Sequence, residues 1–269
     1  MRAVRHHTDC KWVLLYIERW LKAPVSMPDG TLVSRERGTP QGSVISPVLA
    51  NLFLHYAFDC WMQREHPDIP FERYADDAIC HCRSEAQAQK LRQALGQRFA
   101  ECGLQLHPQK TKVIYCQDAN RPGAYPQRSF DYLGYTFRPR SSRNRDGRHF
   151  VSFLPAVSKQ AAKRMRQRVR RWRLHLRSDL KLEEIATWVR PVLGGWVRYY
   201  GRFYPSKLRG ALRTIDQFIV RWAMRKYKRF RGRLRASWNW LQAIKHRNPQ
   251  LFASWSLEPA TCGRMMGAG

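Results

Sequence analysis

Acidic residues are scarce in this 269-residue sequence, which has 20 Asp and Glu against 49 Lys and Arg and a formal net charge of +29. So large an excess of one sign repels itself in a compact fold, and it is typical of proteins that bind a polyanion. Nucleic acid is the predicted partner, with an anionic membrane surface as the alternative. The shortage is greatest after Phe150, where the acidic residues are Asp179, Glu183, Glu184, Asp216 and Glu258.

Other absences exclude whole classes of protein. No apolar run approaches the roughly 20 residues of a membrane span, and no secretory signal is found, so we expect a cytoplasmic protein of bacterial type without a membrane partner. The seven cysteines are scattered, which favours reduced thiols over a disulfide framework. Cys80-His81-Cys82 is followed by no second ligand pair at the spacing of a zinc site, and no helicase-type phosphate loop is present.

Two adjacent carboxylates, Asp76 and Asp77, end the tetrad 74–77, which lies between the segment 71–73 and the alternating run 78–82. This order predicts a hairpin turn. Like charges side by side at a tight turn are unfavourable, and a divalent cation removes the repulsion. Mg²⁺ takes oxygen ligands from one or two carboxylates together with phosphates and water. The pair therefore predicts a metal site, with an ordinary solvated Asp-Asp turn as the alternative.

A loop rich in glycine and proline, residues 37–47, precedes an apolar periodic segment upstream of this pair. Ser46 is placed to cap the expected helix and Pro47 to begin it. The two glycines of the loop let the backbone approach a ligand closely, and Gln41 offers both a donor and an acceptor. Plain turn chemistry before a helix is the alternative.

Four motifs occur in order: the loop Gly38-Thr39-Pro40-Gln41-Gly42, the tetrad 74–77, the stretch 103–112 and the stretch 130–137. Over most of residues 12–140 this order resembles the palm of a group II intron reverse transcriptase. The resemblance implies an RNA-directed DNA polymerase in which Asp76 and Asp77 are catalytic carboxylates of a two-metal Mg²⁺ site. It also implies deoxynucleoside triphosphates as substrates and an RNA template with a DNA primer as partners.

The resemblance assigns roles to further residues. Lys110 matches a lysine that stabilises or protonates the pyrophosphate leaving group, with a solvated surface lysine as the alternative. Leu133 and Gly134 match the primer grip, where a glycine lets the backbone lie close to the primer end. The residues that would lie along the incoming nucleotide are Pro40, Gln41, Gly42, Tyr74 and Ala75.

The sequence departs from the family pattern in one respect. The family uses a further Asp, on a strand before the glutamine loop, to bind both metal ions. The acidic residues upstream of Arg37 lie in no such strand-like context; they are Asp9, Glu18, Asp29 and Glu36. The fingers region is absent as well. We therefore expect an N-terminally truncated chain with an incomplete metal site, which does not polymerise DNA without an N-terminal fragment in trans; the alternative is a catalytically inactive RNA-binding splicing factor.

The second half of the sequence predicts a basic, all-helical domain. Ser158 can cap a helix whose apolar stripe includes Met165 and Val169. Two further helices are expected, at 182–193 and 208–222, each followed by aromatic residues interleaved with cations. Such interleaving suits single-stranded RNA, because rings stack on unpaired bases while cations hold the backbone; packing in the core is the alternative for the tryptophans. The expected RNA-binding residues are Arg164, Arg166, Arg168, Arg170, Arg171, Arg198, Arg202, Arg225, Lys226, Lys228 and Arg229.

This half resembles the thumb and maturase-specific domain of group II intron proteins. The family pattern of Asn-Pro, Gly-Trp and Tyr corresponds here to Arg190-Pro191, Gly195-Trp196 and Tyr199, with Arg190 in place of Asn. The implied partner is group II intron RNA, whose splicing such a domain assists.

The predicted fold class is α+β, with a partial right-hand polymerase palm, built of an antiparallel sheet and helices, before an all-helical basic domain. The expected boundaries are palm 1–141, extended linker 142–157, thumb and maturase-specific domain 158–245 and C-terminal tail 246–269.

Overall fold

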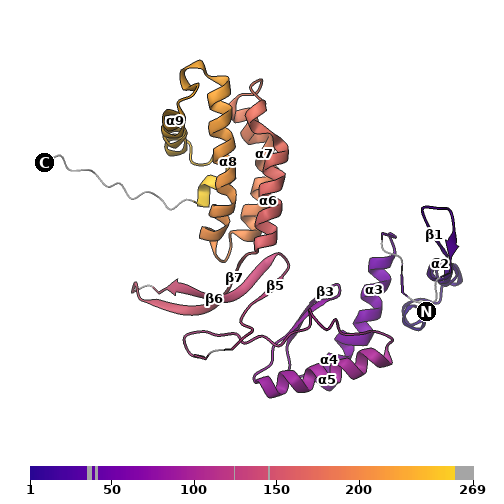
Figure 1. Cartoon of the computed structure of the whole chain (residues 1–269). Helices are drawn as coiled ribbons and strands as arrows, with labels where there is room; N and C mark the ends of the chain where they lie inside the picture. The colour runs from indigo at the N-terminus through magenta and orange to yellow at the C-terminus, as the bar shows by residue number, and fades with distance from the viewer. Residues whose placement is uncertain (35–37, 40–41, 124, 145, 258–269) are drawn as a thin grey trace. The chain divides into compact units, whose positions relative to one another are not determined.

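The computed structural model describes residues 1–34, 38–39, 42–123, 125–144 and 146–257. The chain divides into two compact units, Met1–Val113 and Ile114–Gly269. Both units contain helices and antiparallel strands, which confirms the predicted α+β class (Figure 1). Within the described residues no helix is both long enough and apolar enough to cross a bilayer.

Two small apolar clusters hold the first unit together. α1, α2 and α3 meet through Val4, Ile17 and Leu49. α4 and α5 meet through Met62 and Leu91. The elements of this unit are α1 (Arg2–His7), α2 (Lys11–Lys22), β1 (Val25–Ser26), β2 (Leu32–Val33), α3 (Ser46–Leu54), the π-helix η1 (His55–Asp59), α4 (Cys60–Glu65), β3 (Phe71–Tyr74), β4 (Asp77–Cys80) and α5 (Glu85–Glu101).

The start of α3 lies one residue earlier than predicted. Ser46 is the first helical residue and is buried, while Ile45 occupies the cap position and supplies no side-chain hydrogen bond. Pro47 stands in the first turn as expected, where a residue without an N–H and with a fixed φ is tolerated. The prediction that Ser46 caps this helix is therefore corrected.

The second unit begins with a three-stranded antiparallel sheet in the order β5-β6-β7. Its strands are β5 (Phe130–Tyr132), β6 (Tyr135–Arg143) and β7 (His149–Val157). β6 and β7 pair over their whole length, from Tyr135 opposite Val157 to Arg143 opposite His149. Of the predicted linker 142–157, residues 142–143 end β6 and His149–Val157 form β7, so most of this segment is paired strand, in which the backbone groups are satisfied. The two compact units divide after Val113, while the predicted boundaries of palm, thumb and maturase-specific domain stay a prediction.

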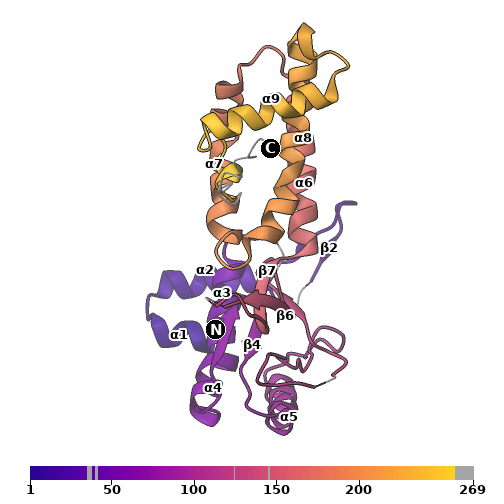
Figure 2. The same ribbon diagram turned by 90° about the vertical axis from the view of Figure 1, so that its left-hand side faces the viewer.

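Helices make up the rest of the second unit. α6, α7 and α8 run beside one another, and α9 crosses them, as Figure 2 shows. The helices are α6 (Lys159–Trp172), α7 (Leu182–Tyr200), α8 (Pro205–Lys226) and α9 (Leu234–Arg247), with short 3₁₀ segments η2 (Leu174–Leu176), η3 (Lys228–Phe230) and η4 (Ala253–Leu257).

The predicted cap of α6 is confirmed. Ser158 Oγ accepts a hydrogen bond of 3.1 Å from the N–H of Ala161, and Met165 and Val169 of the predicted stripe are buried. α7, by contrast, continues to Tyr200 rather than ending at Leu193, even though it contains Pro191. Tertiary packing outweighs local propensity here, because the apolar face of α7 is buried in the core.

The segment after α9 belongs to the core of this unit. Leu251, Phe252 and Trp255 are buried, so residues 246–257 are not the tail that the sequence predicted. Trp255 Nε1 donates a 2.9 Å hydrogen bond to Asp216 on α8, and Lys245 Nζ donates one of 2.7 Å to the same carboxylate. This buried ion pair and indole fasten α9 and η4 to α8.

Candidate active site and nucleic-acid interface

The predicted hairpin around the carboxylate pair is confirmed. β3 and β4 pair in antiparallel register with Tyr74 opposite Asp77, so Ala75 and Asp76 form a two-residue turn. Ala75 has a φ of 53°, in the left-handed region. That conformation is unfavourable by roughly 1–2 kcal/mol for a residue with a Cβ, and strain of this kind is often found at functional sites.

The side chains of Asp76 and Asp77 are exposed and form no hydrogen bond or ion pair within the described residues. Two unpartnered carboxylates offer the hard oxygen ligands that Mg²⁺ prefers, and the metal commonly takes only one or two of them beside substrate phosphates. Among the described residues no group of three or more His, Cys, Asp or Glu side chains could hold a metal. The donor set therefore fits a Mg²⁺ ion that is shared with the phosphates of a bound nucleotide. It does not fit an ion that is enclosed by protein ligands alone.

Arg73, on β3, holds the hairpin turn in place through hydrogen bonds. Its guanidinium donates bidentate hydrogen bonds of 2.6 Å and 2.6 Å to Asp59, and also bonds Asn51 at 2.9 Å and the carbonyl of Ala75 at 2.8 Å. Burial raises the pKa of the Asp59 carboxyl, but the hydrogen bonds and charge of Arg73 outweigh it and leave that pKa lowered. The turn that carries Asp76 is therefore tied to the helices that precede it.

Lys110 lies in a turn that follows α5. The ring Nδ1 of His107 accepts hydrogen bonds from the N–H groups of Gln109 at 3.2 Å and Lys110 at 3.4 Å, which orders this turn. The Lys110 side chain is exposed, and within the described residues it forms no ion pair with Asp76 or Asp77. The Lys110 ammonium therefore has no partner among the described residues, and it is not bonded to Asp76 or Asp77.

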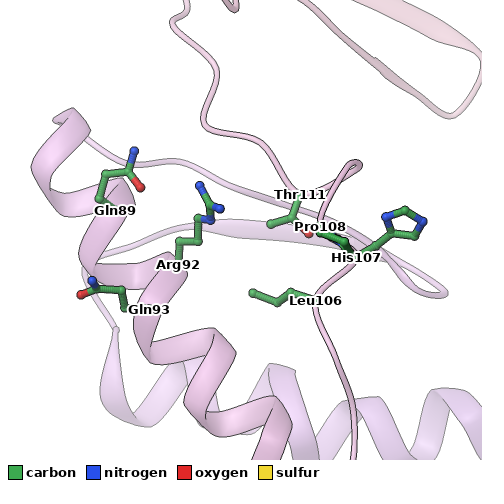
Figure 3. A pocket seen from close by; sticks show the side chains of 7 residues that line it. All are labelled: Gln89, Arg92, Gln93, Leu106, His107, Pro108 and Thr111. Atoms are coloured by element: carbon green, nitrogen blue, oxygen red, sulfur yellow. The ribbon is translucent and has the colours of Figure 1, made fainter.

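A shallow hollow of about 480 Å³ lies beside the Lys110 turn, between α5 and the segment after it. Figure 3 shows Leu106 and Thr111 pointing from this segment toward the helix. Neither Asp76 nor Asp77 lines the hollow, so it is distinct from the carboxylate pair. The lining residues are Gln89, Arg92, Gln93, Leu106, His107, Pro108 and Thr111.

The predicted nucleotide-binding residues fall into two groups. Pro40 and Gln41 lie outside the described residues. Gly42 has a φ of 95°, with open space where a Cβ would lie, so its backbone is accessible to a ligand. Tyr74 and Ala75 are exposed on the carboxylate hairpin, which brings them next to Asp76.

The predicted primer grip is a tight turn between β5 and β6. Leu133 and Gly134 both have positive φ, at 49° and 80°, as a type I′ hairpin turn requires. The carbonyl of Leu133 accepts a 2.9 Å hydrogen bond from the hydroxyl of Tyr199, and the carbonyl of Gly134 accepts one of 2.9 Å from the N–H of Ser158. A Cβ on Gly134 would lie 2.5 Å from Tyr200 Oη. The helical part of the unit therefore holds this turn in place.

Replacing Gly134 by alanine is expected to destabilise the second unit. The left-handed φ alone costs about 1–2 kcal/mol with a Cβ, and the clash with Tyr200 adds to this. Gly194→Ala is the matched control, since Gly194 is helical with open space around it and gains up to about 1 kcal/mol. Urea unfolding of both variants tests this; equal stabilities contradict it.

Most of the predicted RNA-binding cations are exposed. Those of α6 form no ion pair within the described residues, and Arg166 alone among them is half-buried. Lys226 differs, because its Nζ donates hydrogen bonds to the carbonyls of Ser178 at 2.9 Å and Leu180 at 2.7 Å. Its ammonium therefore holds the 178–180 loop, and its part in RNA binding stays a prediction.

The tryptophans follow the alternative of packing in the core. Trp222 is fully buried and donates a hydrogen bond of 2.8 Å to the carbonyl of Arg177. Trp172 and Trp196 stack with ring centroids 5.9 Å apart and pack against the core. Trp222 is therefore not available to stack on RNA bases, whereas Trp172 and Trp196 are half-buried.

Comparison with protein families accounts for both halves of the chain. Residues 2–137 match the model for reverse transcriptase (RNA-dependent DNA polymerase), which spans all four motifs. The chain belongs to the reverse transcriptase family. Residues 162–238 match the group II intron maturase-specific domain, which identifies it as a group II intron reverse transcriptase and maturase. No curated protein matches the chain.

Membership of the reverse transcriptase family gives the activity as RNA-directed DNA polymerase. The maturase-specific match spans α6, α7 and α8 and reaches into α9, which are the helices that bear the exposed arginines. Intron RNA and nucleic-acid substrates follow as the class of partner, and the family generally uses Mg²⁺.

Sequence reasoning missed Arg73, Asp59 and the tyrosines behind the primer-grip turn. Arg73 directly precedes the carboxylate tetrad, and a cation at that position was an available signal. Tyr199 and Tyr200 lie far from Gly134 along the chain, so that contact had no local signal.

Proposed function

We propose that this reverse transcriptase binds group II intron RNA through its helical unit and carries a Mg²⁺-dependent nucleotidyl-transfer site at the β3–β4 turn. The observation that carries the proposal is the pair of exposed carboxylates, Asp76 and Asp77, which have no partner within the described residues. An aspartate pair at a strained turn is stabilised when a cation offsets its repulsion.

The residues of the hairpin and of the glycine-rich loop would bind the metal ion and the incoming nucleotide. Asp76 and Asp77 hold Mg²⁺, which supplies charge neutralisation on the phosphates of the incoming deoxynucleotide. Tyr74 and Ala75, with Pro40, Gln41 and Gly42, lie along that nucleotide.

Lys110 supplies an ammonium for the pyrophosphate that leaves, and its exposed, unpaired side chain supports this role. Leu133 and Gly134 support the end of the DNA primer, which is paired with an RNA template.

The intron RNA is proposed to lie on the arginine-rich surface of the helical unit. The supporting observation is the number of exposed cations without an acidic partner. The proposed contacts are Arg164, Arg166, Arg168, Arg170, Arg171, Arg198, Arg202, Arg225, Lys228 and Arg229, and each neutralised phosphate steepens the salt dependence of binding.

Filter binding with two RNAs of equal length tests the maturase role. We expect group II intron RNA to bind at least about 10-fold more tightly than an unstructured RNA at moderate salt, because specific binding exceeds the electrostatic background. Equal affinity for both RNAs would reduce the helical unit to a general polyanion binder.

A second candidate function is an RNA-binding splicing factor without polymerase activity. The observation that favours it is the lack, among the described residues, of a third acidic or other ligand near a metal position. The two functions differ over Asp76 and Asp77, since only polymerisation requires their charge. Splicing assistance that survives loss of both carboxylates, in a chain that extends no primer, would favour this candidate.

A further inference from the structure

Three exposed arginines gather where η2 packs on α8. Arg221 and Arg225 lie on the α8 face that also carries Phe218, at helical spacings of three and seven residues. The ring of His175, in η2, lies 5.3 Å from the ring of Phe218. Arg173 immediately precedes η2, so its backbone lies next to this contact between η2 and α8, which we call the η2 corner.

This corner is rigidly held. Trp222 Nε1 and Lys226 Nζ, both on α8, donate hydrogen bonds to carbonyls of the segment after η2, and Leu174 of η2 is fully buried. Arg173 has a φ of 48°, a conformation that residues other than glycine seldom adopt. The guanidinium of Arg221 lies 5.5 Å from the centroid of the Phe218 ring, which helps to fix its position.

The charges of all three arginines reach the ring of His175, and within the described residues no acidic side chain pairs with them. The pKa of His175 is lowered by burial first and then by the charges of Arg225, Arg221 and Arg173. None of the three forms an ion pair within the described residues, and the nearby carboxylate of Asp179 is bound to Arg177 at 3.1 Å. Three like charges on a fixed scaffold repel one another unless an anion lies between them.

We propose that Arg173, Arg221 and Arg225 form a clamp for one backbone phosphate group of the RNA that the helical unit binds. The inference rests on the proposed RNA-binding function and adds a defined site to it. Guanidinium groups suit this task because their planar N–H donors match phosphate oxygens in pairs. His175 is the packing residue under the clamp, since its half-buried ring packs against Phe218 and its Nδ1 is buried.

The clamp also gives the RNA a continuous path. Arg170 and Arg171 lie in the last turn of α6, just before Arg173, and Lys228 and Arg229 follow Arg225 beyond the end of α8. Two groups of predicted RNA-binding residues that are distant in sequence therefore meet through the η2 corner. Arg173 and Arg221 were not among the residues that the sequence singled out.

The test compares two triple variants of the full chain with equal loss of charge. One replaces the clamp residues, Arg173→Gln, Arg221→Gln and Arg225→Gln. The control replaces three exposed arginines elsewhere in the unit, Arg213→Gln, Arg235→Gln and Arg247→Gln. The probe is group II intron RNA, titrated at several salt concentrations, and thermal unfolding checks that both variants fold.

We expect the clamp variant to bind at least about 10-fold more weakly, with a log–log salt slope smaller by about 0.7–0.9, because the loss of one phosphate contact removes that much from the slope. The control variant should keep the wild-type slope within about 0.5. A triple Arg→Lys variant at the clamp positions should restore the salt slope, because the slope depends on charge. It should not restore the full affinity, because that needs the paired N–H donors of guanidinium groups.

Equal losses in the clamp and control variants overturn this inference alone, since the corner then contributes only general charge. A wild-type chain that does not bind RNA overturns the inference together with the proposed function. Full affinity in the Arg→Lys variant also contradicts the clamp, because an unspecific positive patch requires charge and nothing more.

Discussion

In an assay supplied with the N-terminal fragment that the sequence predicts is needed, replacing Asp76 and Asp77 together by asparagine is expected to abolish RNA-templated primer extension with Mg²⁺. The charge stabilisation that a metal gives to a phosphoryl-transfer transition state is worth several kcal/mol, so the loss is at least about 10³-fold. Asparagine keeps the size of each side chain at an exposed turn, so the hairpin should remain folded. Primer extension followed on a gel measures the effect.

Metal binding provides a readout that does not depend on turnover. Mn²⁺ can replace Mg²⁺ at oxygen sites and is observed directly by electron paramagnetic resonance. In the presence of a deoxynucleoside triphosphate, the wild-type chain should bind Mn²⁺ more tightly than the double variant does. Asp9→Asn is the matched control, because Asp9 is another exposed carboxylate without a partner in the described residues.

Several outcomes would contradict the assignment of the carboxylate pair. Primer extension that persists in the double variant means that the metal is held elsewhere. Equal Mn²⁺ affinity in the wild type and the double variant would also mean that the metal is held elsewhere. RNA affinity should be unchanged in both aspartate variants, so that a loss of RNA binding would point to misfolding rather than to a missing metal ligand.

The second large effect is expected from the buried ion pair of the helical unit. Asp216→Ala leaves the Lys245 ammonium without its carboxylate at a position where the lysine side chain is only 6% exposed. Breaking a buried pair by removing one partner typically costs about 3–5 kcal/mol. For a chain of this size we expect the Tm to fall by roughly 10 °C.

Two controls separate the buried charge from the loss of contacts. The double variant Asp216→Leu with Lys245→Met removes both charges and should recover most of the stability, because apolar residues of similar volume often replace a buried pair at little cost. Asp179→Ala removes an exposed pair with Arg177 in the same unit and should leave the Tm unchanged. A double variant as unstable as the single one would show that Lys245 was not left uncompensated.

Local patterns explain why much of the site was predictable. The alternation around the tetrad 74–77 determines a hairpin through the preferences of the strands and the turn alone, and the structure has β3 and β4 at those residues. Ser158 capped α6 as predicted, since a cap bonds backbone only three residues away. The helix predicted at 208–222 also lies within α8.

Apart from the cap of α3, which is displaced by one residue, the expectations that the structure did not meet involve partners that are distant in the sequence. Residues 142–157 contain many charges and turn formers, and nothing local indicates that β7 pairs with β6 over its length. Lys226 reads as a free cation until the 178–180 carbonyls are placed beside it. The segment 246–257 reads as a tail because its burial depends on α7 and α8.

The sequence by itself determined the family, the carboxylate pair and the basic character of the helical unit, because motifs, charge and short-range periodicity are properties of the chain. The tertiary structure decided which polar groups are committed and which are free. Arg73 is bound to Asp59, and the ammonium of Lys226 is bonded to the carbonyls of Ser178 and Leu180. Such pairings depend on long-range packing, in which a side chain's neighbours come from other elements and not from adjacent positions in the chain.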